Sequence, residues 1–284
     1  MAFHAIEIYF PLDFQPPRWR YKPGSFIAHF VGHEGPGSLL SYLKSKGWVT
    51  ALHSGPQLLA RGISMFKVTI YLTQEGFSKY FHFYGKFGFM LTLSRSENNR
   101  LIMVAVFKYL SLLRSSELPA WYQREMSLMS QTRFRFKEKT KPESYAVWVS
   151  THMEWPVPRD LILAAPQLVW EWDETDPDGS GLEEIRRVLD SLTIDKGRAV
   201  LMAKPEEHDK ISASDAVWEK EPIYGTCYRV EELGKDFVEQ VKRLSYVRYY
   251  TVDRGWLPAP RPQRHSGTEA PWTERIHTHQ FGCG

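Results

Sequence analysis

The chain has 284 residues, of which 43% are hydrophobic and 24% charged, with 36 Lys and Arg against 33 Asp and Glu. These values exclude disordered, collagen-like and highly charged classes of protein. A formal net charge of +3 also gives no basic footprint of the kind that nucleic-acid binders carry, so we expect no nucleic-acid partner. The length allows one large or two modest domains.

The cysteine count and the length of the apolar runs indicate the cellular compartment of the protein. Cys227 and Cys283 are the two cysteines, which is too few for a disulfide framework and fits a reducing environment. The opening residues lack the pattern of a secretory signal, and no stretch reaches the about 18 apolar residues of a membrane span. We therefore expect a soluble, cytoplasmic protein with no membrane partner.

The first part of the chain alternates between strand and helix periodicity. Gly47 marks the end of the second helix, because glycine commonly follows a helix C-terminus. In chain order, the pattern predicts a strand at 5–10, helices at 25–33 and 38–46, a strand at 48–52, a loop at 54–62 and a strand at 64–72.

The second part of the chain is mainly helical. The pattern predicts helices at 101–113, 120–136, 144–153 and 182–192, a short helix within 155–172 and a buried strand at 198–203. This alternation of strands and helices predicts the α+β class. We expect one unit in which a mainly antiparallel sheet is covered by helices on one face.

Candidate chemistry gathers in the segment 29–37. His29 and His33 are four residues apart and would share one face of a helix, as metal binding by two ligands of one helix requires. The residues between them include no carboxylate that could act as a general base. Glu34 lies about 100° further around the helix and would point away from the pair. Three interpretations stay open: histidines that pack or cap a helix end, a binding site, and an active metal site.

Other chemical motifs are weak in this sequence. No glycine-rich phosphate loop is present, and neither cysteine has a neighbouring histidine that would activate a thiolate. The basic run at 133–141, with its interleaved phenylalanines, is typical of a solvated helix end in a chain of this net charge. These patterns identify no catalytic residue.

The run HFVGHEGPGSLLSYLKSKGW at 29–48 closely resembles the second domain of the insulysin and a-factor-processing (insulinase) family of zinc metalloendopeptidases. Further matches follow in the same order at 72–76, 134–137 and 224–228, and together they cover roughly residues 5 to 245. The resemblance implies a metallopeptidase-like α/β roll. It also implies several such units in the whole enzyme, which enclose a chamber where peptides are cut.

Zinc belongs to another unit of that family. The first unit carries the motif His-x-x-Glu-His and a distant glutamate ligand, and His29-x-x-Gly32-His33 can be read as a degenerate copy of it. Gly32 stands where the general-base glutamate would be, and the third ligand has no counterpart. We therefore expect no zinc bound by this chain, no catalytic residue in it and no hydrolysis by the chain alone.

The resemblance implies a substrate-anchoring role for this unit. In the family, the second domain holds the amino-terminal end of a long peptide, which adds as a strand to a sheet edge. Residue by residue, His29, Gly32 and Glu34 match the helix side of that anchor, and Leu52 matches its strand side. Glu34 would pair with the α-amino group of the peptide. Pro56 departs from the family, because it lacks the backbone donor that an added strand would use.

We expect residues 1–250 to form the insulysin-like second domain, with a family-foreign insert at about 81–100, followed by a disordered-looking, proline-rich tail at 251–284. The insert and tail suggest a fragment from a truncated or mis-spliced gene model. The alternative function is a stand-alone, non-catalytic peptide-binding or regulatory subunit that pairs with an active metallopeptidase chain. Expected partners are peptide substrates and either the missing catalytic domains or such a second chain. The content of 16 Phe, 14 Tyr and 10 Trp indicates an extensive core, a partner surface, or both.

Overall fold

A computed structural model describes residues 4–77, 97–118, 120–170, 181–211 and 217–246. The strands are β1 (Ala5–Leu12), β2 (Val49–Ala60), β3 (Ile63–Leu72), β4 (Arg198–Met202), β5 (Glu219–Lys220) and β6 (Cys227–Tyr228). The α-helices are α1 (Pro23–Val31), α2 (Leu39–Ser45), α3 (Gln74–Phe77), α4 (Glu97–Ser115), α5 (Ala120–Arg135), α6 (Pro142–His152), α7 (Gly181–Ser191), α8 (Pro205–Ile211) and α9 (Lys235–Tyr246). Short 3₁₀ helices are η1 (Pro16–Arg18) and η2 (Arg159–Leu161).

Strands β1 to β4 form one antiparallel sheet in the order β2-β3-β1-β4. Alternation along β1 places Ile6, Ile8 and Phe10 in the core, while Glu7 and Tyr9 lie on the opposite face. Since β2 and β4 each pair with one neighbour, they are the two edge strands of this sheet.

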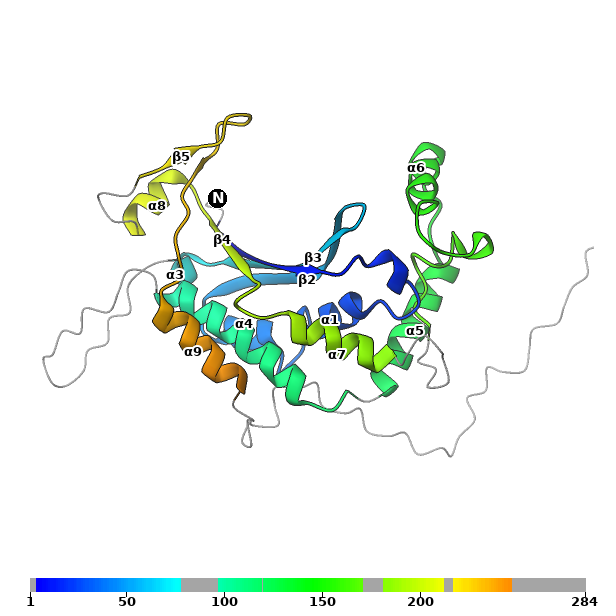
Figure 1. The fold of residues 1–284 in the computed structure, drawn as a ribbon, viewed down its shortest axis with the longest axis horizontal. Coiled ribbons are helices and arrows are strands. Elements are labelled where there is room, and N and C mark those ends of the chain that lie inside the picture. Colours follow the sequence, from blue (N-terminus) through cyan, green and yellow to red (C-terminus); the bar gives the residue numbers. More distant parts are fainter. Residues whose placement is uncertain (1–3, 78–96, 119, 171–180, 212–216, 247–284) are drawn as a thin grey trace, which may run out of the picture.

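The helices α1, α4, α7 and α9 lie on one face of the sheet, and α6 and the β5–β6 hairpin rise at opposite ends beyond the other face (Figure 1). Apolar residues of α4 at helical spacing, among them Ile102, Val106 and Leu110, are fully buried beneath the strands. The predicted α+β class, with an antiparallel sheet and helices on one face, is confirmed.

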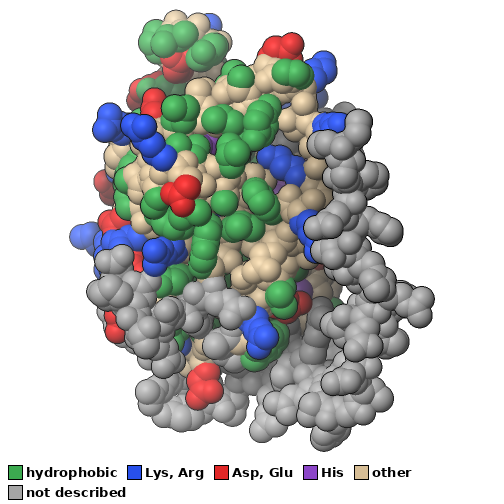
Figure 2. Space-filling model, turned by 90° about the vertical axis from the view of Figure 1, so that its right-hand side faces the viewer, with side chains coloured by type: hydrophobic (Ala, Val, Ile, Leu, Met, Phe, Trp, Pro, Cys, Tyr) green, Lys and Arg blue, Asp and Glu red, His purple; other side chains and the backbone are tan. Residues whose placement is uncertain are grey.

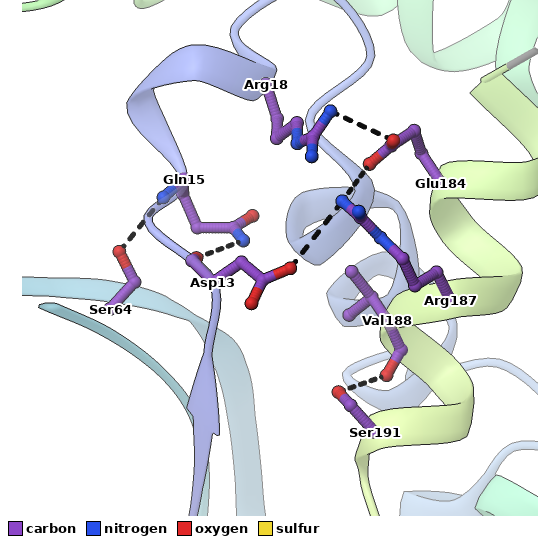
Figure 3. A network of polar contacts seen from close by, with 8 residues as sticks. All are labelled: Asp13, Gln15, Arg18, Ser64, Glu184, Arg187, Val188 and Ser191. Atoms are coloured by element: carbon purple, nitrogen blue, oxygen red, sulfur yellow. Dashed lines mark hydrogen bonds and ion pairs between the residues drawn. The ribbon is translucent and has the colours of Figure 1, made fainter. Parts of the chain in front are cut away.

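A polar network fixes the loop between β1 and α1 against α7 (Figure 3). Glu184 of α7 lies 2.9 Å from the guanidinium of Arg18 and 2.7 Å from that of Arg187, measured from its two carboxylate oxygens. The backbone N–H of Gln15 donates to Ser64 Oγ of β3 at 3.1 Å. These contacts hold the start of α1 in a fixed position relative to the sheet.

Two predictions about the strands are wrong. The loop predicted at 54–62 is the continuation of β2, which pairs with β3 as far as Ala60, opposite Ile63. Pro56 is tolerated there because β2 is an edge strand. The strand at 198–203 exists as β4 but is not buried, since its first three residues are exposed at the other edge of the sheet.

The expected insert at about 81–100 and the tail at 251–284 lie outside the described residues, apart from 97–100, which form the first turn of α4. The predicted division of the chain at residue 250 therefore stays a prediction. Within the described ranges, every helix is too short or too polar to cross a membrane.

Candidate functional site

A pocket of about 470 Å³ lies between the end of α1 and strand β2. The four residues expected at a peptide anchor, which are His29, Gly32, Glu34 and Leu52, all contribute to its wall. The full lining is Ala28, His29, Gly32, His33, Glu34, Gly35, Leu52, His53 and Ser54. Residues that are about twenty positions apart in the sequence thus meet at one concave surface.

The end of α1 determines which side chains reach the pocket. The helix stops at Val31, and the backbone N–H of Gly32 donates to the carbonyl of Ala28 at 2.8 Å. The chain then leaves the helical path, so His33 and Glu34 lie on the same pocket as His29. The helix that was predicted to reach residue 33 ends at Val31, and Glu34 lines the same pocket as the two histidines.

Packing from two other helices holds this helix end in place. The hydroxyl of Tyr109, which is buried on α4, donates to the carbonyl of Phe30 at 3.1 Å. Burial raises the pKa of Tyr109 above its usual range, so the hydroxyl keeps its proton and remains a donor. The Phe30 ring also meets the Tyr122 ring of α5 edge to face, with centroids 4.8 Å apart. One face of α1 is thereby fixed, and the other is left for the pocket.

Glycines allow the close approaches that shape the pocket. A Cβ atom at Gly35 would lie 2.6 Å from His33 Nε2, so a larger residue would displace that ring. A Cβ atom at Gly32 would lie 3.2 Å from Ser54 Oγ on β2. The Ser54 hydroxyl donates to the Ala28 carbonyl at 3.1 Å and joins the edge of β2 to α1.

The polar groups of the pocket are available to a ligand. Within the described residues, the carboxylate of Glu34 makes no hydrogen bond or ion pair, and neither do the imidazoles of His29, His33 and His53. The rings of His29 and His33 have centroids 6.1 Å apart. Burial lowers the pKa of His29, and the charge of His33 lowers it further.

Among the described residues, no group of three or more His, Cys, Asp or Glu side chains could hold a metal ion. Gly32 also supplies no carboxylate that could act as a base at a bound water. The imidazoles and the Glu34 carboxylate of the pocket can form hydrogen bonds and, when charged, ion pairs.

Comparisons with known proteins bear on the family and the fold of this chain. The family model described as the middle or third domain of peptidase M16 matches residues 134–251. The chain is 31% identical over 235 residues to the insulin-degrading enzyme of Drosophila melanogaster, an alignment that covers 83% of this chain and 20% of that protein. It is 27% identical over 238 residues to the A-factor-processing enzyme of Saccharomyces cerevisiae, with 84% of this chain and 20% of that protein covered.

The chain belongs to the insulinase family, peptidase M16. Its fold is similar to the crystal structure of pitrilysin, with a TM-score of 0.66 at 17% identity, over 86% of this chain and 22% of that one. This insulinase-family chain spans about a fifth of the length of the curated relatives it matches. It corresponds to a middle domain of such a peptidase.

Sequence reasoning did not assign His53 to the site, although this residue lies in the pocket wall. The position of His53, directly after Leu52 at the edge of a strand, was the available signal. It carried little weight, because the strand was predicted to end at residue 52.

Proposed function

We propose that this chain anchors the amino-terminal end of an extended peptide, as the second, non-catalytic domain of a larger insulinase-family peptidase. The observation that supports this proposal most directly is the Glu34 carboxylate, which is unpaired among the described residues and lines a pocket beside β2, an edge strand of the described sheet. The amino-terminal end of an extended peptide offers a charged amino group and the backbone that follows it. A carboxylate can bind the amino group, and a strand edge can form hydrogen bonds with the backbone.

The peptide would make two kinds of contact at this site. Its α-amino group donates to Glu34, and its first residues run along the edge of β2 next to Leu52 and His53. Backbone hydrogen bonds of this kind tolerate varied peptide sequences. Pro56 offers no N–H, and its ring lies against Gly24 of α1, so the added strand would end before that position.

Peptide hydrolysis itself would occur elsewhere in the complete enzyme. Gly32 stands in place of a general base, and the pocket offers no residue set for a metal ion among the described positions. We propose that the role of this unit is to hold a substrate so that a zinc-bearing unit can cut it. That arrangement would increase the time for which a long peptide stays in the cutting chamber.

The anchor is tested with two peptides that differ only at the amino terminus. We expect the full chain to bind a peptide that has a free α-amino group and no charged side chains. N-acetylation of this peptide should weaken binding about tenfold, since a hydrogen bond to a charged group contributes about 1.5–3 kcal/mol. Glu34→Gln should cause the same loss, as measured by fluorescence anisotropy. Glu232→Gln, at an exposed glutamate far along the chain, serves as the control. Equal affinity for both peptides would contradict the proposal.

A second function is supported by a different surface, which is the side that carries α5 and α6. Figure 2 shows hydrophobic side chains gathered there among Lys and Arg. Helix α6 has no buried residue, and Phe136, Val147 and Met153 are 73%, 65% and 63% exposed. Such a surface is typical of one that binds another protein domain. We propose that it contacts a catalytic M16 domain or chain, either within a longer protein or as a separate subunit.

A further inference from the structure

Three imidazoles line the same pocket as the carboxylate that would receive the peptide's amino group. His29 comes from α1, His33 from the segment that follows it, and His53 from β2, and all three line the same pocket as Glu34. Within the described chain, none of these rings has a hydrogen-bond partner. Histidine is the side chain that changes charge between about pH 5 and 8. The pocket therefore combines three histidine rings with one carboxylate, that of Glu34.

The charges around His29 differ from one side to the other. The centroid of the His33 ring lies 6.1 Å from that of His29, and Glu34 lines the same pocket. From α5, Glu125 acts to raise the pKa of His29 and Arg133 to lower it, while burial lowers it most. His53 meets the ring of Tyr71 on β3, with centroids 5.7 Å apart. At neutral pH these conditions keep His29 uncharged, and acidification adds positive charge to the pocket.

We propose that His29 and His33 make peptide anchoring pH-dependent, so that their protonation at mildly acidic pH releases the amino terminus from Glu34. This inference rests on the proposed function. A protonated imidazole repels the peptide's ammonium group across a small pocket. It also competes with that group for the Glu34 carboxylate, and both effects weaken binding.

The sign follows from proton linkage. The bound ammonium disfavours the charged imidazole, so the imidazole pKa is lower in the complex than in the free protein. Affinity is therefore constant above the free-protein pKa and falls as the pH drops below it. A shift of about one pKa unit corresponds to about a tenfold loss of affinity. Above about pH 8 the α-amino group loses its own proton, so the binding profile has a maximum near neutral pH.

The experiment measures anisotropy of a labelled peptide that has a free amino terminus and no ionisable side chains, at about pH 5.5, 6.5 and 7.5. We expect the affinity of the full chain to fall about tenfold from the highest to the lowest pH. The double variant His29→Gln, His33→Gln should lose less than about twofold over the same range, whatever its affinity at neutral pH. His152→Gln, on α6 and outside the pocket, should behave as the unsubstituted chain does.

A second measurement covers the case in which the double variant binds no peptide. Imidazole C–H resonances of the full chain, recorded over the same pH range with and without saturating peptide, should show ring protonation displaced to lower pH in the complex. A flat affinity profile, an equal loss in the double variant, or unshifted imidazole titrations would overturn the pH dependence and leave the anchor standing. Absence of binding at every pH would instead overturn the anchor, and the pH dependence with it.

Discussion

Lys22 shows how one side chain can connect distant parts of this chain. It precedes α1 with φ of 44°, and its ammonium donates to the carbonyls of Trp19 and Ala165 at 2.8 and 2.7 Å. It also donates to the carbonyl of Leu168. Burial lowers the pKa of Lys22 to about 7. The loop before α1 and the segment after η2 are therefore held together by a group that titrates near neutral pH.

The low pKa of Lys22 predicts a pH-dependent stability. Between about pH 7 and 10.4 the unfolded chain keeps a proton on this lysine that the folded chain has lost. The free energy of unfolding should therefore rise with pH in this window, by at most about 1.4 kcal/mol per unit, and this gain should disappear as the pH falls through 7.

Urea denaturation at several pH values measures this slope. Lys22→Met should remove the contribution of this residue to it, while Lys44→Met, at an exposed position of α2, should leave the slope unchanged. A slope that is the same in Lys22→Met and in the unsubstituted chain would contradict the assignment.

At the scale of elements, the short helix α3 explains why the family-like match at 72–76 ends in glycine. The backbone N–H of Gly76 donates to Thr73 Oγ1 at 3.0 Å, and Thr73 Oγ1 in turn donates to the carbonyl of Gly47 at 2.6 Å. A Cβ atom at Gly76 would lie 1.9 Å from the carbonyl oxygen of Trp48, which is backbone and cannot turn aside. The contact of α3 with the chain that enters β2 thus requires glycine at this position.

Gly76→Ala should destabilise the protein by about 2–3 kcal/mol, because α3 must move away from Trp48 and lose its packing. Thermal and urea denaturation measure the loss. Gly55→Ala is the matched control, since a Cβ atom there meets no atom within 4 Å, and it should change stability by less than about 0.5 kcal/mol. Similar effects of the two substitutions would show that α3 is free to shift.

At the scale of the whole molecule, the two exposed surfaces differ in character. On the uncovered face of the sheet, Glu7 accepts hydrogen bonds from Lys67, Tyr9 and Thr69. Burial raises the pKa of Glu7, but these bonds and the Lys67 charge outweigh it and lower the pKa overall. This cluster of polar contacts is compatible with exposure of that part of the face to water. Exposed apolar side chains, among them Phe136, Val147 and Met153, lie along α5, α6 and the segments beside them, which makes that side a candidate for contact with another domain.

Complementation tests this interface. The full chain should restore cleavage of a long fluorogenic peptide by an insulysin-family catalytic chain that lacks its own second domain, and should not cleave the peptide alone. The triple variant Phe136→Ser, Val147→Ser, Met153→Ser should weaken this effect at least about tenfold, because these exposed apolar side chains would be buried in the contact.

Val217→Ser is the control and should complement fully, because Val217 is 79% exposed and lies two positions before β5, at the opposite end of the molecule from α6 (Figure 1). Unchanged melting temperatures are expected for all variants, because the substituted side chains are exposed. Full complementation by the triple variant would place the interface elsewhere.

Much of the fold could be predicted because its signals are local. Alternation in β1 and β3, helical spacing in α4 and α7, and the glycine that follows α2 all depend on a few neighbouring residues. Pro56 misled the prediction of β2, since whether a proline lies in a loop or at a sheet edge depends on which strands pair. The exposure of β4 was missed for the same reason.

By itself, the sequence determined the class of this protein, its family and the candidate residues His29, Gly32, Glu34 and Leu52, because motif and periodicity are properties of the linear chain. Only the tertiary structure decided that they share one pocket and that His53 joins them there. The physical reason is that helix α1 ends at Val31 and β2 has a free edge beside it. Where a helix stops, and which strand lies at an edge, depend on packing between segments that are distant in the sequence.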